Sequence, residues 1–463
     1  MRKILSLLLF VFLSACATLG GNSAPKEYKG FVHKNTYEPF KGIVVQEYEH
    51  LRSGMKVLLE SRPNTGVIAY VTAFGVGSRF EAPGRTGLAH LFEHMMFRGT
   101  PNFPEPFKTL SGWGDRFNAF TSFDLTLYHQ LVPKEVFNEV AQFESERMRK
   151  LQLSEEVFKT ERGAVVSERK MRTVDTPAGR LSWELFQQAF DSHPYQTGPI
   201  GWQEDLDAMT IQDALDFYKR YYAPNRATLA LVGDFKIKEA LNTLDQHYGE
   251  FDRENWVEPV IRSEQLKRKD RRVVIPFQTE TVHMADARFS PGLMNKQNAA
   301  EMLLCSLLAD SKLGYLPSEL VEKKIARSVS DSCYFLVDPS LSTIRLTGNP
   351  GVSIAQLEKA YDAALKKFPT WLNSERLEGI KLYYLEYHLG ELREPMGVAE
   401  SLAYNAVTAN DPMHGFAFMD QIKTVTLDQV RAVWDDWGNR AKTRVILKPS
   451  KKSAPFKKRV FRK

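Results

Sequence analysis

Hydrophobic residues recur along the chain with two different periods. A spacing of three to four residues predicts long helices over 135–151, 154–172, 353–368 and 374–394. Strand-like runs at 55–60 and 67–74 flank a turn-forming segment, 62–66, and predict a hairpin. Strands and helices are mixed without a regular βαβ alternation, so the pattern favours an α+β fold over a doubly wound parallel sheet.

A helix, a turn and a strand recur about 215 residues apart. Thr210 and Thr426 each stand at the N-cap position of an apolar-periodic helix. Asn225 and Asn439 each begin an Asn-Arg-Ala turn that leads into a β-rich run. The offsets are 216 residues at the threonines and 214 at the asparagines. Three features in register at one offset indicate a duplicated domain.

Shifts in composition place the predicted boundaries of the two domains. Charge-dense residues at 251–271 predict a linker between an N-terminal domain, 39–250, and a homologous C-terminal domain, 272–450. Small and polar residues over 16–38 predict a tether, and residues 451–463 form a basic tail.

Residues 1–15 have the composition of an export signal peptide. Two basic residues precede an almost wholly apolar run, 4–13, which is too short to span a membrane. Small residues precede Cys16, and this segment resembles a bacterial lipobox. The resemblance implies that Cys16 becomes the lipidated N-terminus, and that Ala17 directs the lipoprotein to the outer membrane, facing the periplasm. A plain signal peptide with an incidental cysteine is the alternative.

The composition of the chain excludes several classes of protein. Aromatic residues make up 11% of it, too many for a largely disordered protein, and no run of about 20 apolar residues could cross a membrane. Without residues 1–15, 60 basic residues face 56 acidic ones, and the net charge of +4 gives no reason to expect a nucleic-acid partner. Cys305 lies in an apolar run, which predicts burial, and its pairing with Cys333 stays open.

His90, Glu93 and His94 form the motif His-x-x-Glu-His. A spacing of four places the two histidines one turn apart on one helix face, where both can bind a single Zn²⁺. Glu93 projects beside that face and can take a proton from an activated water without ligating the metal. The order is the inverse of the common zinc protease motif. Histidines that merely pack or face solvent are the alternative, but the apolar flanks predict a buried helix whose polar atoms need a partner.

Two histidines leave a catalytic zinc one protein ligand short. The predicted helix over 154–172 offers four glutamates. Glu155 and Glu156 lie in its first turn, where acidic residues suit the helix dipole. Glu161 and Glu168 are seven residues apart and share a face. Spacing alone does not choose between these two as the third ligand.

An ordered set of segments resembles the pitrilysin/insulysin family of zinc peptidases, in particular half-length members similar to mitochondrial processing peptidase. Beyond the zinc motif, these segments are 96–100, 118–128, 161–168, 193–201, 222–225 and 232–235. The resemblance implies two similar domains, each a mixed, mostly antiparallel sheet with helices packed on it. It further implies one Zn²⁺ per chain, with Glu168 as the third ligand and Glu161 as an acid that steadies the site.

Asn118, Ala119 and Thr121 are similar to the family's substrate-binding edge strand, to which an extended peptide adds as a further strand. Turn and strand chemistry is the alternative for Asn118 and Thr121, and Tyr128 is expected in the core. The second domain should lack a metal, since the region equivalent to the zinc motif, 299–308, contains no histidine.

The family resemblance also implies an Arg and a Tyr that a second pair of domains contributes to the active site. Val321 occupies the expected place of the Arg and Arg327 that of the Tyr, if one residue is deleted between them. The chain then cannot supply this pair to a copy of itself. We therefore expect a heterodimer with a homologous chain that carries the pair, and a homodimer is the alternative.

The sequence thus predicts a zinc-dependent metallo-endopeptidase, a hydrolase that cleaves extended peptides or unfolded segments in the periplasm. Its contact with the membrane should be through the N-terminal lipid only. One alternative is a non-catalytic structural or assembly subunit, but such family members typically lose the zinc motif. The other is a dedicated maturation protease for one peptide, which nothing in the sequence separates from general degradation.

Overall fold

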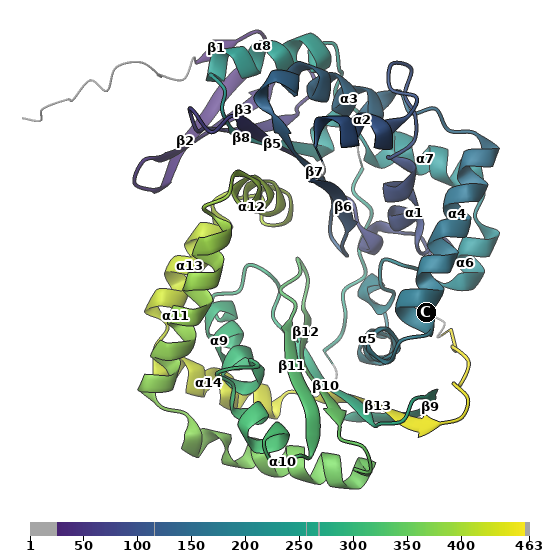
Figure 1. Ribbon diagram of the computed structural model, residues 1–463, viewed down its shortest axis with the longest axis vertical. Helices are drawn as coiled ribbons and strands as arrows, with labels where there is room; N and C mark the ends of the chain where they lie inside the picture. The colour runs from purple at the N-terminus through teal and green to yellow at the C-terminus, as the bar shows by residue number, and fades with distance from the viewer. Residues whose placement is uncertain (1–25, 115, 256, 267–268, 459–463) are drawn as a thin grey trace, which may run out of the picture.

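The computed structural model describes residues 26–114, 116–255, 257–266 and 269–458, and within them the chain forms two β-sheets with helices packed on each (Figure 1). The first sheet runs in the order β1 (Glu27–Tyr28), β2 (Phe31–Phe40), β3 (Ile43–His50), β4 (Lys56–Ser61), β8 (Ala227–Gly233), β5 (Val67–Phe74), β7 (Thr126–Pro133) and β6 (Phe117–Thr121). The second runs in the order β11 (Ala326–Cys333), β12 (Ser340–Gly348), β10 (His283–Ser290), β13 (Lys442–Ser450) and β9 (Arg271–Gln278).

The helices are distributed over both halves of the chain. In the first half they are α1 (Leu88–Met95), α2 (Pro106–Trp113), α3 (Phe137–Arg149), α4 (Glu155–Arg169), α5 (Pro177–Ala189), α6 (Gln203–Ala208), α7 (Ile211–Tyr221) and α8 (Ile237–Tyr248). In the second they are α9 (Asn298–Ala309), α10 (Ile354–Trp371), α11 (Ser374–Glu391), α12 (Pro395–Thr408), α13 (His414–Thr424) and α14 (Leu427–Asn439). Among the described residues, no helix is both long enough and apolar enough to cross a membrane.

The two sheets repeat one topology. The order β6-β7-β5-β8-β4 matches β11-β12-β10-β13-β9, and in both the last pair is parallel while the others are antiparallel. Thr210 and Thr426 cap α7 and α14 through capping boxes, and these helices precede the equivalent strands β8 and β13. The predicted α+β fold of two similar domains, each with a mixed, mostly antiparallel sheet, is confirmed.

The hairpin predicted around residues 62–66 is wrong, because β8 lies between β4 and β5. β8 is parallel to β4, antiparallel to β5 and buried along its length. Gly233 permits this close approach, since a Cβ there would lie 2.2 Å from the Val67 carbonyl oxygen. A local turn signal cannot show that a strand from much later in the chain will separate the two runs.

The first sheet begins earlier in the chain than composition suggests. The predicted tether extends to residue 38, but β1 and β2 begin at Glu27 and Phe31, and the Phe31 side chain is fully buried. Burial of the Phe31 ring stabilises this strand, even though most of the residues around it in the sequence are polar. The predicted export signal and Cys16 lie outside the described residues.

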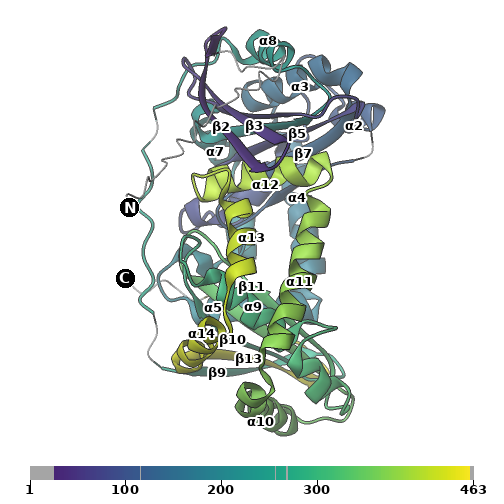
Figure 2. The ribbon, with the colours of Figure 1, turned by 90° about the vertical axis from the view of Figure 1, so that its left-hand side faces the viewer.

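Helices α5 and α12 cross between the two halves (Figures 1 and 2). α12 packs on β5, β7 and β8 of the first sheet, and α5 packs on β10 and β13 of the second. α12 buries Val398, Ala399 and Leu402 against the first sheet, while α5 buries Leu185 and Phe186 against the second. Because each sheet completes its core with a helix from the other half of the sequence, the two lobes depend on one another for stability.

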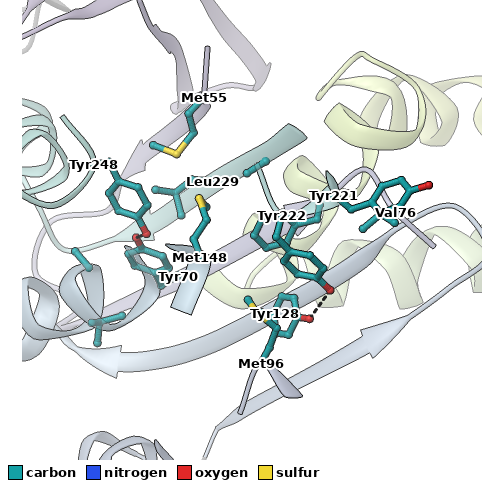
Figure 3. Packing of buried hydrophobic residues seen from close by; sticks show 14 of the residues in the cluster. Met55, Tyr70, Val76, Met96, Tyr128, Met148, Tyr221, Tyr222, Leu229 and Tyr248 are labelled. Atoms are coloured by element: carbon teal, nitrogen blue, oxygen red, sulfur yellow. Dashed lines mark hydrogen bonds between the residues drawn. The ribbon is translucent and has the colours of Figure 1, made fainter. Parts of the chain in front are cut away.

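Tyrosines occupy the centre of the largest hydrophobic cluster (Figure 3). The hydroxyls of Tyr128 and Tyr222 lie 2.9 Å apart, and those of Tyr70 and Tyr248 lie 2.8 Å apart. Each buried hydroxyl therefore has a hydrogen-bond partner inside the core. Tyr128 is in the core, as the sequence predicted.

A disulfide joins α9 to the end of β11. Cys305 is buried, and it is bonded to Cys333, with the two Cα atoms 6.7 Å apart and a sequence separation of 28 residues. The pairing that the sequence left open is therefore made in the structure.

We expect loss of this disulfide to lower the free energy of unfolding by about 3 kcal/mol, because a cross-link that closes a loop of this length restricts the unfolded chain. Urea denaturation with and without a thiol reductant measures the difference. A Cys305→Ser/Cys333→Ser variant should show the lower stability in both conditions. If the reductant destabilises this variant as well, the disulfide is not the cause.

Candidate metal centre

Helix α1 presents the motif residues on one face and an apolar surface on the other. Leu91, Phe92 and Met95 are fully buried, and the Phe92 ring packs against Tyr222 with 4.6 Å between ring centroids. The helix begins after Gly87, whose φ of +92° is the left-handed conformation that favours glycine. The polar face of α1 is thereby turned toward α4 and β6, with which the helix is in contact.

A buried carboxylate holds the N-terminus of α1. Glu81 accepts hydrogen bonds from the backbone N–H groups of Gly87 at 2.9 Å and Ala89 at 2.8 Å. Burial raises the pKa of Glu81 to about 8, although the backbone donors act in the opposite direction. Sequence reasoning missed Glu81, because it stands six residues before the N-cap, where no capping rule would place it.

Glu168 meets both histidines of the motif. Its Oε2 lies 3.6 Å from Nε2 of His90 and 3.3 Å from Nε2 of His94. One ligand atom from each of the three residues lies within 4.8 Å of the others. Ser154 caps the start of α4, since its hydroxyl accepts from Val157 N–H, and α4 carries Glu168 to the polar face of α1.

Glu161 contacts the other side of His94. Its Oε2 lies 3.4 Å from Nδ1 of His94, and its carboxylate is paired with Arg98. A carboxylate at Nδ1 holds the proton there and leaves Nε2 free to ligate a metal. Glu161 and Glu168 therefore lie near different nitrogens of the His94 ring, an arrangement that is compatible with the roles expected of them, a steadying acid and a third ligand. Arg172 pairs with Glu168 at 2.6 Å on the outer side.

The surroundings of His90 and Glu168 shift the pKa of each group toward the form that a metal ligand requires. Burial and the neighbouring His94 lower the pKa of His90 to about 4, so the ring is neutral at neutral pH. The hydrogen bond with His94 lowers the pKa of Glu168, which is then a carboxylate. Two imidazoles and one carboxylate are a donor set that fits Zn²⁺ and leaves a fourth position for water or substrate.

Glu93 lies between the three candidate ligands and the edge of the first sheet. The Thr121 hydroxyl donates a hydrogen bond to its carboxylate. Burial raises the pKa of Glu93, and the Thr121 hydrogen bond opposes that rise. An elevated pKa suits a group that must take up and return a proton.

The predicted substrate-binding residues lie on the edge strand β6, beside Glu93. β6 pairs with β7 at the end of the first sheet. The Ala119 N–H donates to the side-chain oxygen of Asn118 at 2.9 Å rather than to β7, so it points to the open edge. The strand that holds Thr121 against Glu93 therefore also presents a backbone donor to the outside.

The second half of the chain holds the region equivalent to the zinc motif and the two positions expected for the family's Arg and Tyr. Glu301 on α9 is buried and pairs with Arg440 at 2.9 Å. Val321 is half-buried at the end of a short helical turn, and Arg327 is exposed at an irregularity of β11. β11 is the edge strand of the second sheet, in the place that β6 holds in the first.

Family models match most of the chain. The Insulinase (Peptidase family M16) model matches residues 56–197, and the Peptidase M16 inactive domain model matches residues 208–386. The chain belongs to the M16 peptidase family. The resemblance to the pitrilysin/insulysin peptidases is thus confirmed. Every residue of the candidate metal centre lies within the first match.

Several M16 proteins are similar over much of the chain. The zinc protease PqqE of Helicobacter pylori is 29% identical over 429 residues, which cover 90% of this chain and 95% of that protein. The crystal structure of a protease from Helicobacter pylori superposes with a TM-score of 0.83 at 28% identity, covering 88% of this chain and 99% of that one. The half-length character expected from the sequence is therefore confirmed.

Another M16 structure is longer. The periplasmic protease PqqL from Escherichia coli shares the fold with a TM-score of 0.70 at 19% identity, over 92% of this chain and 50% of that one. A probable mitochondrial-processing peptidase subunit beta from Schizosaccharomyces pombe is 24% identical over 202 residues, 43% of this chain and 44% of that protein. This M16 chain therefore spans about half the length of PqqL.

We expect Glu81→Ala to lower the free energy of unfolding by about 1–2 kcal/mol, because it removes the acceptor for two backbone N–H groups at the start of α1. Urea denaturation measures the change. Glu105→Ala is the matched control, since Glu105 precedes α2 but, in the described part of the chain, makes no side-chain cap hydrogen bond. Equal losses in both variants would contradict a capping role for Glu81.

Proposed function

We propose that the protein is a zinc-dependent endopeptidase that cleaves extended peptides or unfolded segments. The convergence of His90, His94 and Glu168, with Glu93 beside them at the open edge of β6, is the observation that carries this proposal. The similarity to proteins named zinc proteases supports it.

His90, His94 and Glu168 would hold one Zn²⁺ per chain. When bound, zinc polarises a carbonyl group and lowers the pKa of water. Glu93 takes the proton of the attacking water and returns it to the nitrogen of the leaving amine. Thr121 holds the Glu93 carboxylate toward the reacting groups by its hydrogen bond.

An extended substrate adds to the edge of the first sheet as a further strand. Main-chain hydrogen bonds supply affinity in this mode of recognition, and they do not depend on substrate sequence. The Ala119 N–H exchanges the Asn118 side chain for a carbonyl of the peptide. The strand so bound runs past Thr121 and Glu93, where the scissile bond is presented. This mode requires an unfolded or extended segment, because a folded substrate has few unpaired strands.

We further propose that a homologous partner chain completes the active site. The family's Arg and Tyr are replaced by Val321 and Arg327, so a heterodimer is favoured over a homodimer. The length of PqqL, of which this chain spans half, supports a site built from two such halves. PqqL is a periplasmic protease, which supports export of this chain. The lipobox-like residues before Cys16 are the basis for the further proposal that it is an outer-membrane lipoprotein.

We expect Glu93→Gln to keep zinc and to lose cleavage by about 100-fold or more, because the amide cannot accept the proton. Zinc content is measured by elemental analysis, and cleavage with a quenched peptide library. Glu155→Gln, an exposed change on α4 away from the ligands, is the control and should keep both. Undiminished cleavage by the Glu93 variant refutes Glu93 as the base. A zinc-loaded wild type that cleaves nothing with its partner present favours a non-catalytic subunit.

We expect the chain purified without its partner to cleave about 100-fold or more slowly than the native complex, because a missing oxyanion donor costs about that much in rate. Isolation of the protein from its native envelope under mild conditions should yield a second chain of M16 type that carries the Arg and the Tyr. A homomeric preparation as active as the native material contradicts the heterodimer.

A further inference from the structure

Residues 451–458 lead from the second sheet back to the first half of the molecule. In Figure 1 the last segment leaves β13 and runs up beside α4, α5 and α6. The Ala454 N–H donates to the Pro276 carbonyl at 2.8 Å, so the segment 454–458 starts on β9. Composition predicted a basic tail here, and the structure places this part of it against the helices that surround the candidate metal centre.

Arg180 of α5 receives the segment. Its guanidinium donates to the carbonyl oxygens of Ala454 at 2.9 Å and Pro455 at 3.3 Å. The same guanidinium lies 3.8 Å from the centre of the Phe456 ring. Arg180 itself is buried and bonded to Glu184 at 2.9 Å, so the receiving group is also held by its own helix.

Phe456 also contacts the residue that follows Glu168. The guanidinium of Arg169 lies 5.0 Å from the Phe456 ring and 5.4 Å from the Trp183 ring. Arg169 is buried and donates to the Gly201 carbonyl at 2.9 Å. A cation within reach of two aromatic rings is attracted to both of them. Phe456 thereby fixes the end of α4 that carries Glu168.

Lys458 is linked through Asp205 to the residue before the other ligand helix. Its ammonium group pairs with Asp205 of α6. The other oxygen of Asp205 accepts a hydrogen bond from the Thr86 hydroxyl at 2.6 Å, and that hydroxyl accepts from Trp202 N–H at 3.0 Å. Thr86 directly precedes Gly87, the N-cap of α1. The charge of Lys458 therefore acts on the segment that sets the position of His90 and His94.

The contact of Phe456 with Arg169 and the contact of Lys458 with Asp205 both lead to the loop that contains Gly201. Gly201, which accepts from Arg169, packs so closely on Thr86 that a Cβ there would lie 2.3 Å from the Thr86 carbonyl oxygen. The end of α4 and the start of α1 are thus joined through the loop that contains Gly201. Residues 454–458 contact groups on both sides of this loop. Ligand atoms must keep their geometry within a few tenths of an ångström for tight zinc binding. Loss of contacts that hold the ligand helices in place should therefore raise the Kd for zinc.

We propose that residues 454–458 form a latch by which the end of the second half positions the metal ligands of the first half. Phe456 positions Glu168 through Arg169, and Lys458 positions α1 through Asp205 and Thr86. The latch rests on the proposed zinc site, because its effect is defined as an effect on the geometry of that site. Neither residue touches a ligand directly, so both are positioning residues.

Zinc affinity of the full-length apo-protein, measured by competition with a chelating dye, tests the latch. Phe456→Ala and Lys458→Ala should each raise the zinc Kd by about 10- to 100-fold, the range seen when groups that orient ligands are removed. Phe456→Tyr and Lys458→Arg should stay within about threefold of the wild type, since they keep the ring and the charge. Lys457→Ala, a change at the exposed residue between them, is the matched control and should leave the Kd unchanged.

Thermal unfolding of the apo-proteins separates positioning from general stability. A latch that only stabilises the fold lowers the Tm of the alanine variants but leaves their zinc Kd at the wild-type value, and this result overturns the proposal. If Phe456→Ala does not fold, Phe456→Leu keeps the apolar volume without the ring and should raise the Kd in the same way. A wild type that binds no zinc at His90 and His94 overturns the proposed function and the latch together.

Discussion

Glu168 reaches His90 and His94 because α4 packs against α1, and the candidate site depends on this contact. The three groups come from two helices that are far apart in sequence, and each would be poorly solvated where it lies. Burial lowers the pKa of His90 to about 4, so the packing itself keeps the imidazole in the neutral form that a metal needs. A cluster of this kind is costly without a cation, which is why the contact between the helices and the binding of zinc should stabilise one another.

The surroundings of that contact come from both halves of the chain. α12 of the second half completes the core of the first sheet, and α5 of the first half completes the core of the second. α5 also carries Arg180, which binds the C-terminal segment, and that segment returns to α4. The duplicated second domain thus supports the site, although the three candidate ligands all lie in the first half of the chain. It supplies a rigid support for helices that must keep their relative position.

Local rules predicted the features that depend on local contacts. Spacing placed His90, Glu93 and His94 on one side of a helix, capping rules placed Thr210 and Thr426, and one offset identified the repeated topology. The choice of Glu168 over Glu161 needed the family resemblance, because seven residues of separation put both on the same face. Long-range contacts were invisible in the pattern. The insertion of β8 and the return of Phe456 to α4 each join segments whose proximity only the folded chain decides. The cap provided by Glu81 is closer in sequence, but no capping rule looks six residues before the N-cap.

A crystal structure of the zinc-loaded protein, with anomalous data collected on both sides of the zinc absorption edge, tests the proposed metal centre most directly. We predict one strong peak between α1 and α4, about 2.0–2.2 Å from Nε2 of His90, Nε2 of His94 and the Glu168 carboxylate. A zinc-loaded crystal without a peak at that position, or with the metal held by other residues, would contradict this assignment.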